Sequence, residues 1–229
     1  MYLGVQGGLD FDQWILAKPD GLIAQKPVLS NSFGVLVGRE FHNNFTIESG
    51  LIRKYYNQGY GVFTGKKLGN FSSVSRRSKT LQIPILLRAK IYGKTKKWAF
   101  TAQLGYHLCW ITETGPSAIS ESSISNRNDT VTVWESTNNS NIKLFGLLET
   151  GIGIEWLLKK EMIFSVTSSY LAGFKTLTVL DVRYQVNAEP NGTASITNRG
   201  DYFAWYVGVR IPLKAFENKE SSPETTGAL

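Results

Sequence analysis

The chain has 229 residues, of which 42% are hydrophobic and 12% aromatic, and its formal net charge is +7 at pH 7. No apolar run approaches the roughly 18 residues that a membrane-spanning helix needs, which excludes a helical membrane protein. A single cysteine, Cys109, excludes an internal disulfide, and the basic residues do not gather on one periodic face as nucleic-acid binding would require.

Eight segments alternate apolar and other residues with a period of two. Each has about nine residues or more, which is enough for a tilted strand to cross a bilayer. The fifth shows the pattern most clearly, because Trp98, Leu104 and Trp110 fall on one face while Gln103 and His107 fall on the other. In chain order we expect strands at 1–9, 33–41, 45–58, 80–92, 98–111, 142–156, 162–175 and 201–213.

The connections between these segments alternate strictly between short and long. Outer-membrane barrels show this asymmetry, with tight periplasmic turns and long exterior loops. The long connections are rich in Ser, Asn, Gly and Thr. The short ones lie near 42–44, 93–97 and 157–161, and the long ones cover about 10–32, 59–79, 112–141 and 176–200.

Large aromatic residues gather toward both ends of the predicted strands. Such residues form two girdles at the interfaces of a membrane barrel. At the short-turn end these are Phe41, Phe45, Trp98 and Trp156, and at the other end Tyr55, Trp110, Phe174 and Phe203.

These patterns predict an all-β fold, an eight-stranded antiparallel up-and-down transmembrane β-barrel in a bacterial outer membrane. The barrel would occupy 1–213, with long outer loops and short periplasmic turns. A polar tail, 214–229, is rich in Ser, Glu, Thr and Pro and is expected to be disordered. The opening MYLGVQGGL lacks the features of a secretory signal, so we interpret it as the start of a mature or trimmed chain.

A soluble sheet also alternates, so a lipocalin-like carrier with its apolar faces turned inward is an alternative. The face opposite the apolar one carries charges beside small residues, which suits a narrow polar lumen. Charges inside so narrow a barrel have to pair. We expect a lumen network formed by Glu48, Arg88, Glu149 and Arg210.

Proline 84 interrupts the fourth predicted strand. Proline donates no hydrogen bond to a ladder and normally lies at an edge or a bulge. Since a closed barrel has no edge, we expect a local bulge at Pro84.

The stretch TLQIPILLRAKIYG at 80–93, the opening LGVQGGLDF and the closing YVGVRIPL resemble the PorT-like outer-membrane β-barrels of Bacteroidota. In that family a strand with an "IPLLLK"-type sequence follows a long outer loop, and Ile83, Pro84, Ile85, Leu86, Leu87 and Arg88 match it. The resemblance implies an OmpA-like eight-stranded fold.

The sequence offers little support for catalysis or for a cofactor. His107 would lie on the polar inner face beside Cys109, where we interpret it as a hydrogen-bonded lumen residue. Two distant histidines and one cysteine do not make a metal site, and no phosphate-binding loop is visible. We therefore expect no catalytic residue, metal or cofactor, with an outer-membrane lipid-modifying enzyme as the alternative.

Two features of the long loops are candidates for contacts outside the chain. The run from Thr130 to Trp134, TVTVW, resembles a short strand that could extend a hairpin above the membrane, and an exposed Trp134 would then be a contact residue for a partner. A basic cluster in the second long loop suits the phosphates or carboxylates of outer-leaflet glycolipid, although a solvated loop is the alternative. Its members are Lys66, Lys67, Arg76, Arg77 and Lys79.

Together these features predict a non-enzymatic barrel that serves as structural anchor, adhesion surface or accessory subunit of an outer-membrane complex for secretion or uptake. The expected partners are outer-membrane lipid and other outer-membrane or periplasmic proteins, and not nucleic acid. The long loops would be its recognition elements.

Overall fold

The structure is a computed structural model of the 229-residue chain. It describes residues 1–16, 23–24, 27–41, 44–57, 61–64, 67–68, 78–95, 97–113, 119–126, 129–139, 142–158, 161–187 and 192–213. The predicted tail, 214–229, lies outside the described residues.

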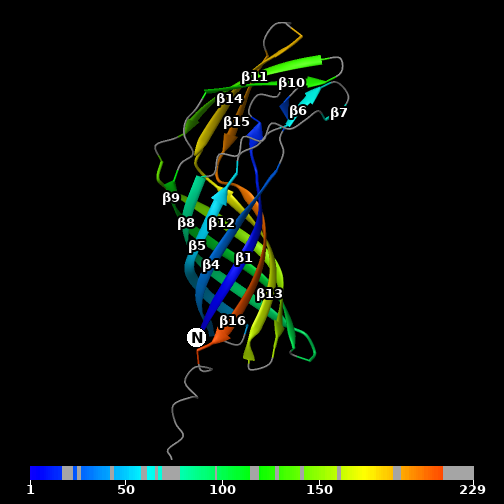
Figure 1. Ribbon diagram of the computed structural model, residues 1–229. Helices are drawn as coiled ribbons and strands as arrows, with labels where there is room; N and C mark the ends of the chain where they lie inside the picture. The colour runs from blue at the N-terminus through cyan, green and yellow to red at the C-terminus, as the bar shows by residue number, and fades with distance from the viewer. Residues whose placement is uncertain are drawn as a thin grey trace, which may run out of the picture.

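Eight antiparallel strands close into a barrel in the order β1-β16-β13-β12-β9-β8-β5-β4 (Figure 1). The predicted fold class and all eight predicted strands are confirmed. Closure joins the first strand to the last, with Tyr2 opposite Pro212 and Asp12 opposite Tyr202. The strands are β1 (Tyr2–Asp12), β4 (Val28–Phe41), β5 (Phe45–Tyr56), β8 (Ser78–Tyr92), β9 (Trp98–Glu113), β12 (Leu144–Leu157), β13 (Ile163–Gly173) and β16 (Tyr202–Pro212).

The outer surface of the barrel is apolar and its lumen is polar. Along β9, Phe100, Leu104 and Leu108 are exposed while the alternate residues Gln103 and His107 are buried. A soluble barrel would show the reverse, so the inward-facing apolar surface that the carrier alternative required is contradicted. Because lipid tails offer no hydrogen bonds, an apolar exterior and a closed ladder are what a bilayer demands.

The two predicted aromatic girdles lie where the strands end. Trp98 and Trp156 are direct partners across the β9–β12 ladder at the short-turn end, and both are exposed. Trp110 and Phe174 are exposed at the opposite end, which we call the loop end. The exposed apolar belt between the girdles faces outward on every side of the barrel and matches a bilayer core.

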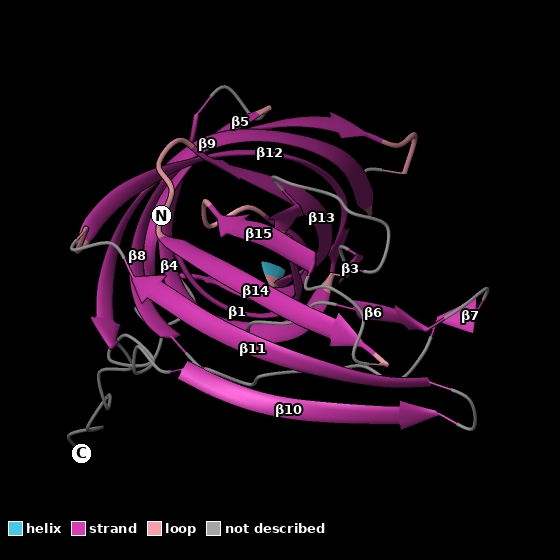
Figure 2. Cartoon of the chain, turned by 90° about the horizontal axis from the view of Figure 1, so that it is seen from above, coloured by secondary structure: helices cyan, strands magenta, loops and turns pink. Residues whose placement is uncertain are grey.

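The long connections contain strands, of which only the run from Thr130 to Trp134, now part of β11, was predicted. Parts of three connections far apart in sequence form a five-stranded sheet, which we call the outer sheet, in the order β10-β11-β14-β15-β2, at the loop end (Figures 1 and 2). A small sheet joins β3, β6 and β7. These strands are β2 (Ile15–Leu16), β10 (Ile119–Asn126), β11 (Asp129–Asn139), β14 (Thr178–Val186), β15 (Gly192–Asn198), β3 (Ile23–Ala24), β6 (Gly61–Thr64) and β7 (Lys67–Leu68).

The bulge predicted at Pro84 is wrong. The β5–β8 ladder keeps one register across Pro84, from the pair Ser49 and Ile85 to the pair Ile52 and Gln82. The register shift in β8 lies instead between Lys79 and Thr80. Proline removes one donor from a ladder without adding a residue, so the strand keeps its register on both sides.

Among the described residues, no helix is both long enough and apolar enough to cross a membrane.

The belt can be tested by placing a charge at its centre. Leu104 lies midway along β9 with 55% of its surface exposed. We expect Leu104→Arg to destabilise the barrel in lipid vesicles by about 2–4 kcal/mol, because a charge at the bilayer midplane loses its hydration. Urea titration of folding into vesicles measures this change.

The matched control is Thr193→Arg on the outer sheet, where the residue is already exposed. It should change the free energy of unfolding by about 0.5 kcal/mol or less. Equal effects of the two substitutions would contradict an outward-facing membrane belt.

Candidate functional sites in the lumen and the outer sheet

Near the short turns, a cluster of ion pairs crosses the lumen. Glu48 binds Arg88 Nη2 at 3.0 Å and Arg210 Nε at 2.7 Å, and it accepts a hydrogen bond from the Tyr2 hydroxyl. Glu155 binds Arg88 at 3.0 Å and Arg210 at 2.7 Å. Each guanidinium therefore bridges two carboxylates, and the cluster ties β1, β5, β8, β12 and β16 together from inside.

The middle of the lumen holds a second polar group built around Glu149. His107 Nε2 lies 2.5 Å from Glu149, and His107 Nδ1 lies 3.1 Å from the Gln82 side-chain oxygen. Gln103 donates to Glu149 and also to the Ser169 hydroxyl at 3.1 Å. These contacts provide hydrogen bonds to buried side chains, although the Gln103 side-chain oxygen has no partner.

Toward the loop end, a buried lysine is enclosed by acids and aromatic rings. Lys54 Nζ lies 3.0 Å from Asp10 and 2.8 Å from Asp12, and all three side chains are fully buried. The ammonium also lies over the Tyr56 ring at 4.5 Å and the Tyr202 ring at 4.1 Å. We call this group the lysine cage. It lies where β1 leaves the barrel, so it fixes the path of the chain toward the outer sheet.

The outer sheet has a hydrophobic core of its own. Its centre is Trp14, only 1% exposed, which continues the chain beyond β1. The other buried members come from three strands of the outer sheet. They are Val133, Leu180, Val182, Tyr184, Ala194 and Ile196.

Several hydrogen bonds join the outer sheet to the barrel. Trp14 Nε1 donates to the backbone carbonyl of Asn57 at 3.2 Å, and the backbone N–H of Asn57 donates to the Asp12 carboxylate at 2.8 Å. The Gln13 amide donates to the Asp201 carbonyl at 2.9 Å. Since Asp12 also binds Lys54, the lysine cage and the core of the outer sheet share one chain of contacts.

The structure brings three of the four predicted lumen residues together. Glu48, Arg88 and Arg210 form one cluster, whereas Glu149 lies apart from it with His107. The second carboxylate of the cluster, a place expected for Glu149, is Glu155, which lies further along β12. Both carboxylates alternate onto the inner face, so the sequence pattern alone did not choose between them.

The lysine cage was not foreseen. The first strand was expected to end at residue 9, and it continues to Asp12. The signal was present, because Leu9 and Phe11 extend the apolar alternation and place Asp10 and Asp12 on the inner face. Reading that alternation to its end would have shown two acids facing into the barrel.

The geometry around His107 does not favour the lipid-modifying enzyme. His107 is fully buried, and its two ring nitrogens contact Gln82 and Glu149 rather than a serine. Cys109 is also fully buried, with its sulfur 3.7 Å from the His107 carbonyl. A nucleophile and base acting on lipid have to reach the lipid-facing surface. Within the described part of the chain, no group of three or more His, Cys, Asp or Glu residues is arranged to hold a metal ion.

The predicted surface contacts fall in different places. Of the basic cluster, Lys66, Arg76 and Arg77 lie outside the described residues and Lys67 lies on β7. Lys79 forms an exposed ion pair with Glu113.

Trp134 lies on β11 with its side chain half-buried. Its direct partner on β14 is Arg183, whose direct partner on β15 is Thr193, and both of these are exposed. Since directly opposed residues share a face of a sheet, Trp134 lies on the face opposite the Trp14 core.

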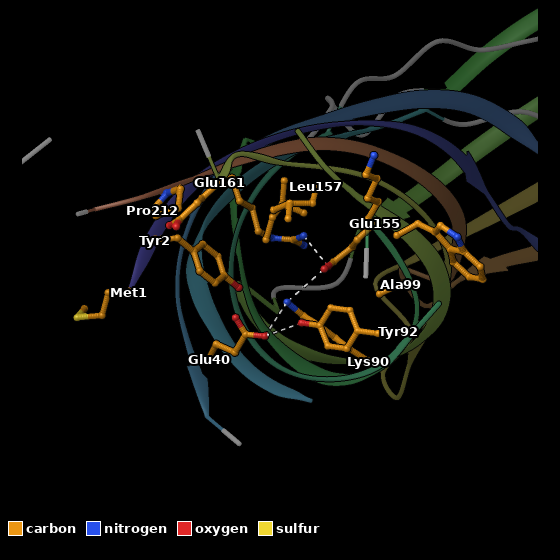
Figure 3. Close-up of a pocket in the computed structure, with 14 residues that line it drawn as sticks. Met1, Tyr2, Glu40, Lys90, Tyr92, Ala99, Glu155, Leu157, Glu161 and Pro212 are labelled. Carbon is orange, nitrogen blue, oxygen red and sulfur yellow. Dashed lines mark hydrogen bonds and ion pairs between the residues drawn. The ribbon is translucent and has the colours of Figure 1, made fainter. Parts of the chain in front are cut away.

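A cavity of about 450 Å³ lies at the short-turn end of the lumen (Figure 3). We call it the short-turn cavity. Charged and aromatic side chains line it together with a few aliphatic ones. The lining residues are Met1, Tyr2, Glu40, Lys90, Tyr92, Lys97, Trp98, Ala99, Glu155, Leu157, Glu161, Ile163, Arg210 and Pro212.

No family model and no curated protein sequence matches the chain. Among solved structures, the chain is similar to the outer membrane protein OprG from Pseudomonas aeruginosa, with 14% identity, a TM-score of 0.48, and coverage of 91% of this chain and 94% of that one. A major outer membrane protein from Thermus thermophilus has 7% identity, a TM-score of 0.43, and coverage of 90% and 98%. The β domain of the Bordetella autotransporter BrkA has 8% identity, a TM-score of 0.30, and coverage of 93% and 100%.

The class of protein follows from the barrel itself. A closed eight-stranded sheet with an exposed apolar belt, two aromatic girdles and a polar interior is built to cross a bilayer with strands. The protein is an outer-membrane β-barrel, located in the bacterial outer membrane.

The ion-pair cluster should dominate the stability of the barrel. Glu48→Gln leaves Arg88 and Arg210 short of one carboxylate in a buried site, so we expect unfolding to require about 3–5 kcal/mol less free energy. The exposed Glu113→Gln breaks its ion pair with Lys79 for about 1 kcal/mol or less. Urea midpoints of the two variants compare the effects, and equal losses would contradict a buried cluster.

The lysine cage should stabilise the outer sheet more than it stabilises the barrel. Lys54→Met leaves two buried carboxylates unpaired where the chain enters the outer sheet. We expect amide hydrogen exchange in β14 and β15 to become about 100-fold faster or more, with slow exchange kept in β8 and β9. The exposed Lys175→Met is the control and should change neither. Uniform acceleration across both regions would show that the cage has no local role.

Proposed function

We propose that the protein is a non-enzymatic outer-membrane binding platform, a barrel that holds a folded recognition surface outside the cell. Within this proposal it serves as a structural anchor, an adhesion surface or an accessory subunit of an outer-membrane complex for secretion or uptake. Its partners are outer-membrane lipid and other proteins of the envelope.

One observation carries the proposal: parts of three long connections combine into a single sheet with its own core. Loops that merely join strands have no need of a buried tryptophan or of a joint to the barrel. Here Trp14 fixes the core, and Asp12 and Asn57 tie it to the barrel wall. A surface held rigidly in this way loses little conformational entropy when it binds a partner.

The exposed face of the outer sheet has the composition of a recognition surface. Trp134 supplies an aromatic side chain, with the charged residues Arg183 and Asp181 exposed beside it on β14. The hydroxyl residues Thr193 and Ser195 continue the same face on β15. Aromatic and arginine side chains are enriched where protein surfaces bind partners.

The lumen supports a platform rather than a pore. Glu48, His107 and Lys54 lie at three successive levels of the lumen, and none of them has any exposed surface. An eight-stranded barrel is just wide enough for its own side chains to fill. A steady ion current would require these contacts to open.

The assignment to PorT-like barrels of Bacteroidota, with an OmpA-like fold, is part of this proposal. It is supported by the segment from Ile83 to Arg88, which lies in the centre of β8 and alternates apolar residues outward with Arg88 inward. Contact between the basic cluster and outer-leaflet glycolipid is likewise proposed, with Lys79 at the loop end of β8 and Lys67 on β7 as its described members.

Site-specific crosslinking in outer membranes of the source bacterium tests the platform. A photo-crosslinking residue at Arg183 or Thr193 is expected to give a discrete protein or glycolipid adduct. The same residue at Ile85, 61% exposed on the lipid-facing belt, should give bulk lipid adducts only.

Planar bilayers containing the purified chain should show no steady current. Absence of a discrete adduct at both outer positions, together with steady conductance, would contradict the proposal.

A further inference from the structure

In the short-turn cavity, a carboxylate of the chain itself occupies a site made by two donors. Glu40 Oε1 lies 3.3 Å from Lys90 Nζ and accepts a hydrogen bond from the Tyr92 hydroxyl at 3.0 Å (Figure 3). The Lys90 side chain is only 3% exposed, whereas the Glu40 side chain is 37% exposed. Lys90 is therefore a donor fixed in the barrel wall, whereas Tyr92, which is 40% exposed, and Glu40 both reach solvent, so that Glu40 has room to turn outward.

We propose that this pair of donors is a binding site for organic carboxylates, and that Glu40 is the internal group that a ligand displaces. The ligand's carboxylate would bind Lys90 and Tyr92, and its body would lie in the short-turn cavity. The site faces the periplasm, because the short turns of outer-membrane barrels lie on that side.

The charges of the cluster favour an anionic guest. Three cations, Arg88, Lys90 and Arg210, face three carboxylates, Glu40, Glu48 and Glu155, so the cluster is neutral when Glu40 is in place. When Glu40 turns outward, two carboxylates remain for three cations, which leaves one positive charge (3 − 2 = +1). A ligand carboxylate restores neutrality, and a neutral or cationic ligand does not.

The exchange avoids the usual cost of burying a charge. Lys90 is already desolvated, and its second partner, Glu155 at 3.2 Å, stays in place throughout. The carboxylate that leaves, Glu40, returns to water. Only the ligand's own carboxylate has to be desolvated, and the buried Lys90, which is already positioned, offsets that cost with a further hydrogen bond from Tyr92.

The other residues of the cavity determine which chemical group, besides the carboxylate, the ligand carries. Leu157 and Ile163, direct partners across the β12–β13 ladder, contribute aliphatic side chains to its lining. A volume of about 450 Å³ falls within the range of small-molecule sites, roughly 300–1,000 Å³. The favoured ligand is thus a small carboxylate with an apolar or aromatic body, either a free metabolite or the carboxyl end of a periplasmic polypeptide.

Phenylacetate, titrated calorimetrically into the full chain in detergent micelles, tests the site, with the neutral phenylacetamide as its matched control. Because Glu40 competes for the same donors, Glu40→Gln should bind phenylacetate about fivefold more tightly or better. Tyr92→Phe removes one hydrogen bond to the charged group and should bind about tenfold more weakly.

The matched control variant is Glu161→Gln. Glu161 is an exposed acid that also lines the cavity, and no described contact joins it to Lys90 or Tyr92. It should change the affinity about twofold or less, since water screens its charge. A gain in Glu40→Gln that Glu161→Gln does not share separates displacement from a general loss of negative charge.

A second pair of probes identifies the source of the carboxylate. A short peptide ending in a free phenylalanine carboxylate is compared with the same peptide amidated at that end. Binding of the free peptide without binding of phenylacetate indicates a polypeptide terminus, and binding of phenylacetate indicates a small molecule; both support the site. The proposal is overturned if no carboxylate binds Glu40→Gln, if phenylacetamide binds as well as phenylacetate, or if Glu40→Gln and Glu161→Gln bind phenylacetate equally.

Discussion

A closed sheet of eight strands leaves a lumen that only side chains can fill, and every charge placed there has to be compensated inside the barrel. The rest of this structure depends on that constraint. Near the short turns, Arg88 and Arg210 each bridge Glu48 and Glu155, so cations and carboxylates from opposite walls neutralise one another. Farther along, the lysine cage does the same with two acids and two aromatic rings. The compensated lumen lets the apolar residues turn outward to the membrane.

The side chains that fill the lumen also separate the two ends of the molecule. At the loop end, Asp12 links the lysine cage to the outer sheet, so the outer sheet is continuous with the barrel wall. At the short-turn end, the cluster closes one side of a cavity whose exposed acid, Glu40, completes its charge balance. The proposed platform facing outward and the proposed carboxylate site facing the periplasm are compatible, because the filled lumen isolates one from the other.

The barrel could be predicted from the sequence because period-two alternation is a local signal that each strand carries by itself. The outer sheet could not be assembled in this way, since its strands come from connections far apart in the chain. The run around Trp134 suggested a strand, but nothing local indicated that it pairs with β14. Pairing inside the lumen was predicted only in part, because alternation places both Glu149 and Glu155 on the inner face without showing which one faces the arginines. The bulge predicted at Pro84 is absent because a missing hydrogen-bond donor does not require an extra residue in the strand.

The central claim is that the chain is a closed barrel in the membrane, with its apolar faces outward. The most direct measurement is gel electrophoresis, without and with boiling, of the detergent-extracted protein from isolated outer membranes. A compact, closed barrel resists unfolding by detergent at room temperature, so the account predicts a membrane-bound protein whose mobility changes on boiling. A protein that remains in the soluble fraction and shows the same mobility before and after boiling would contradict it.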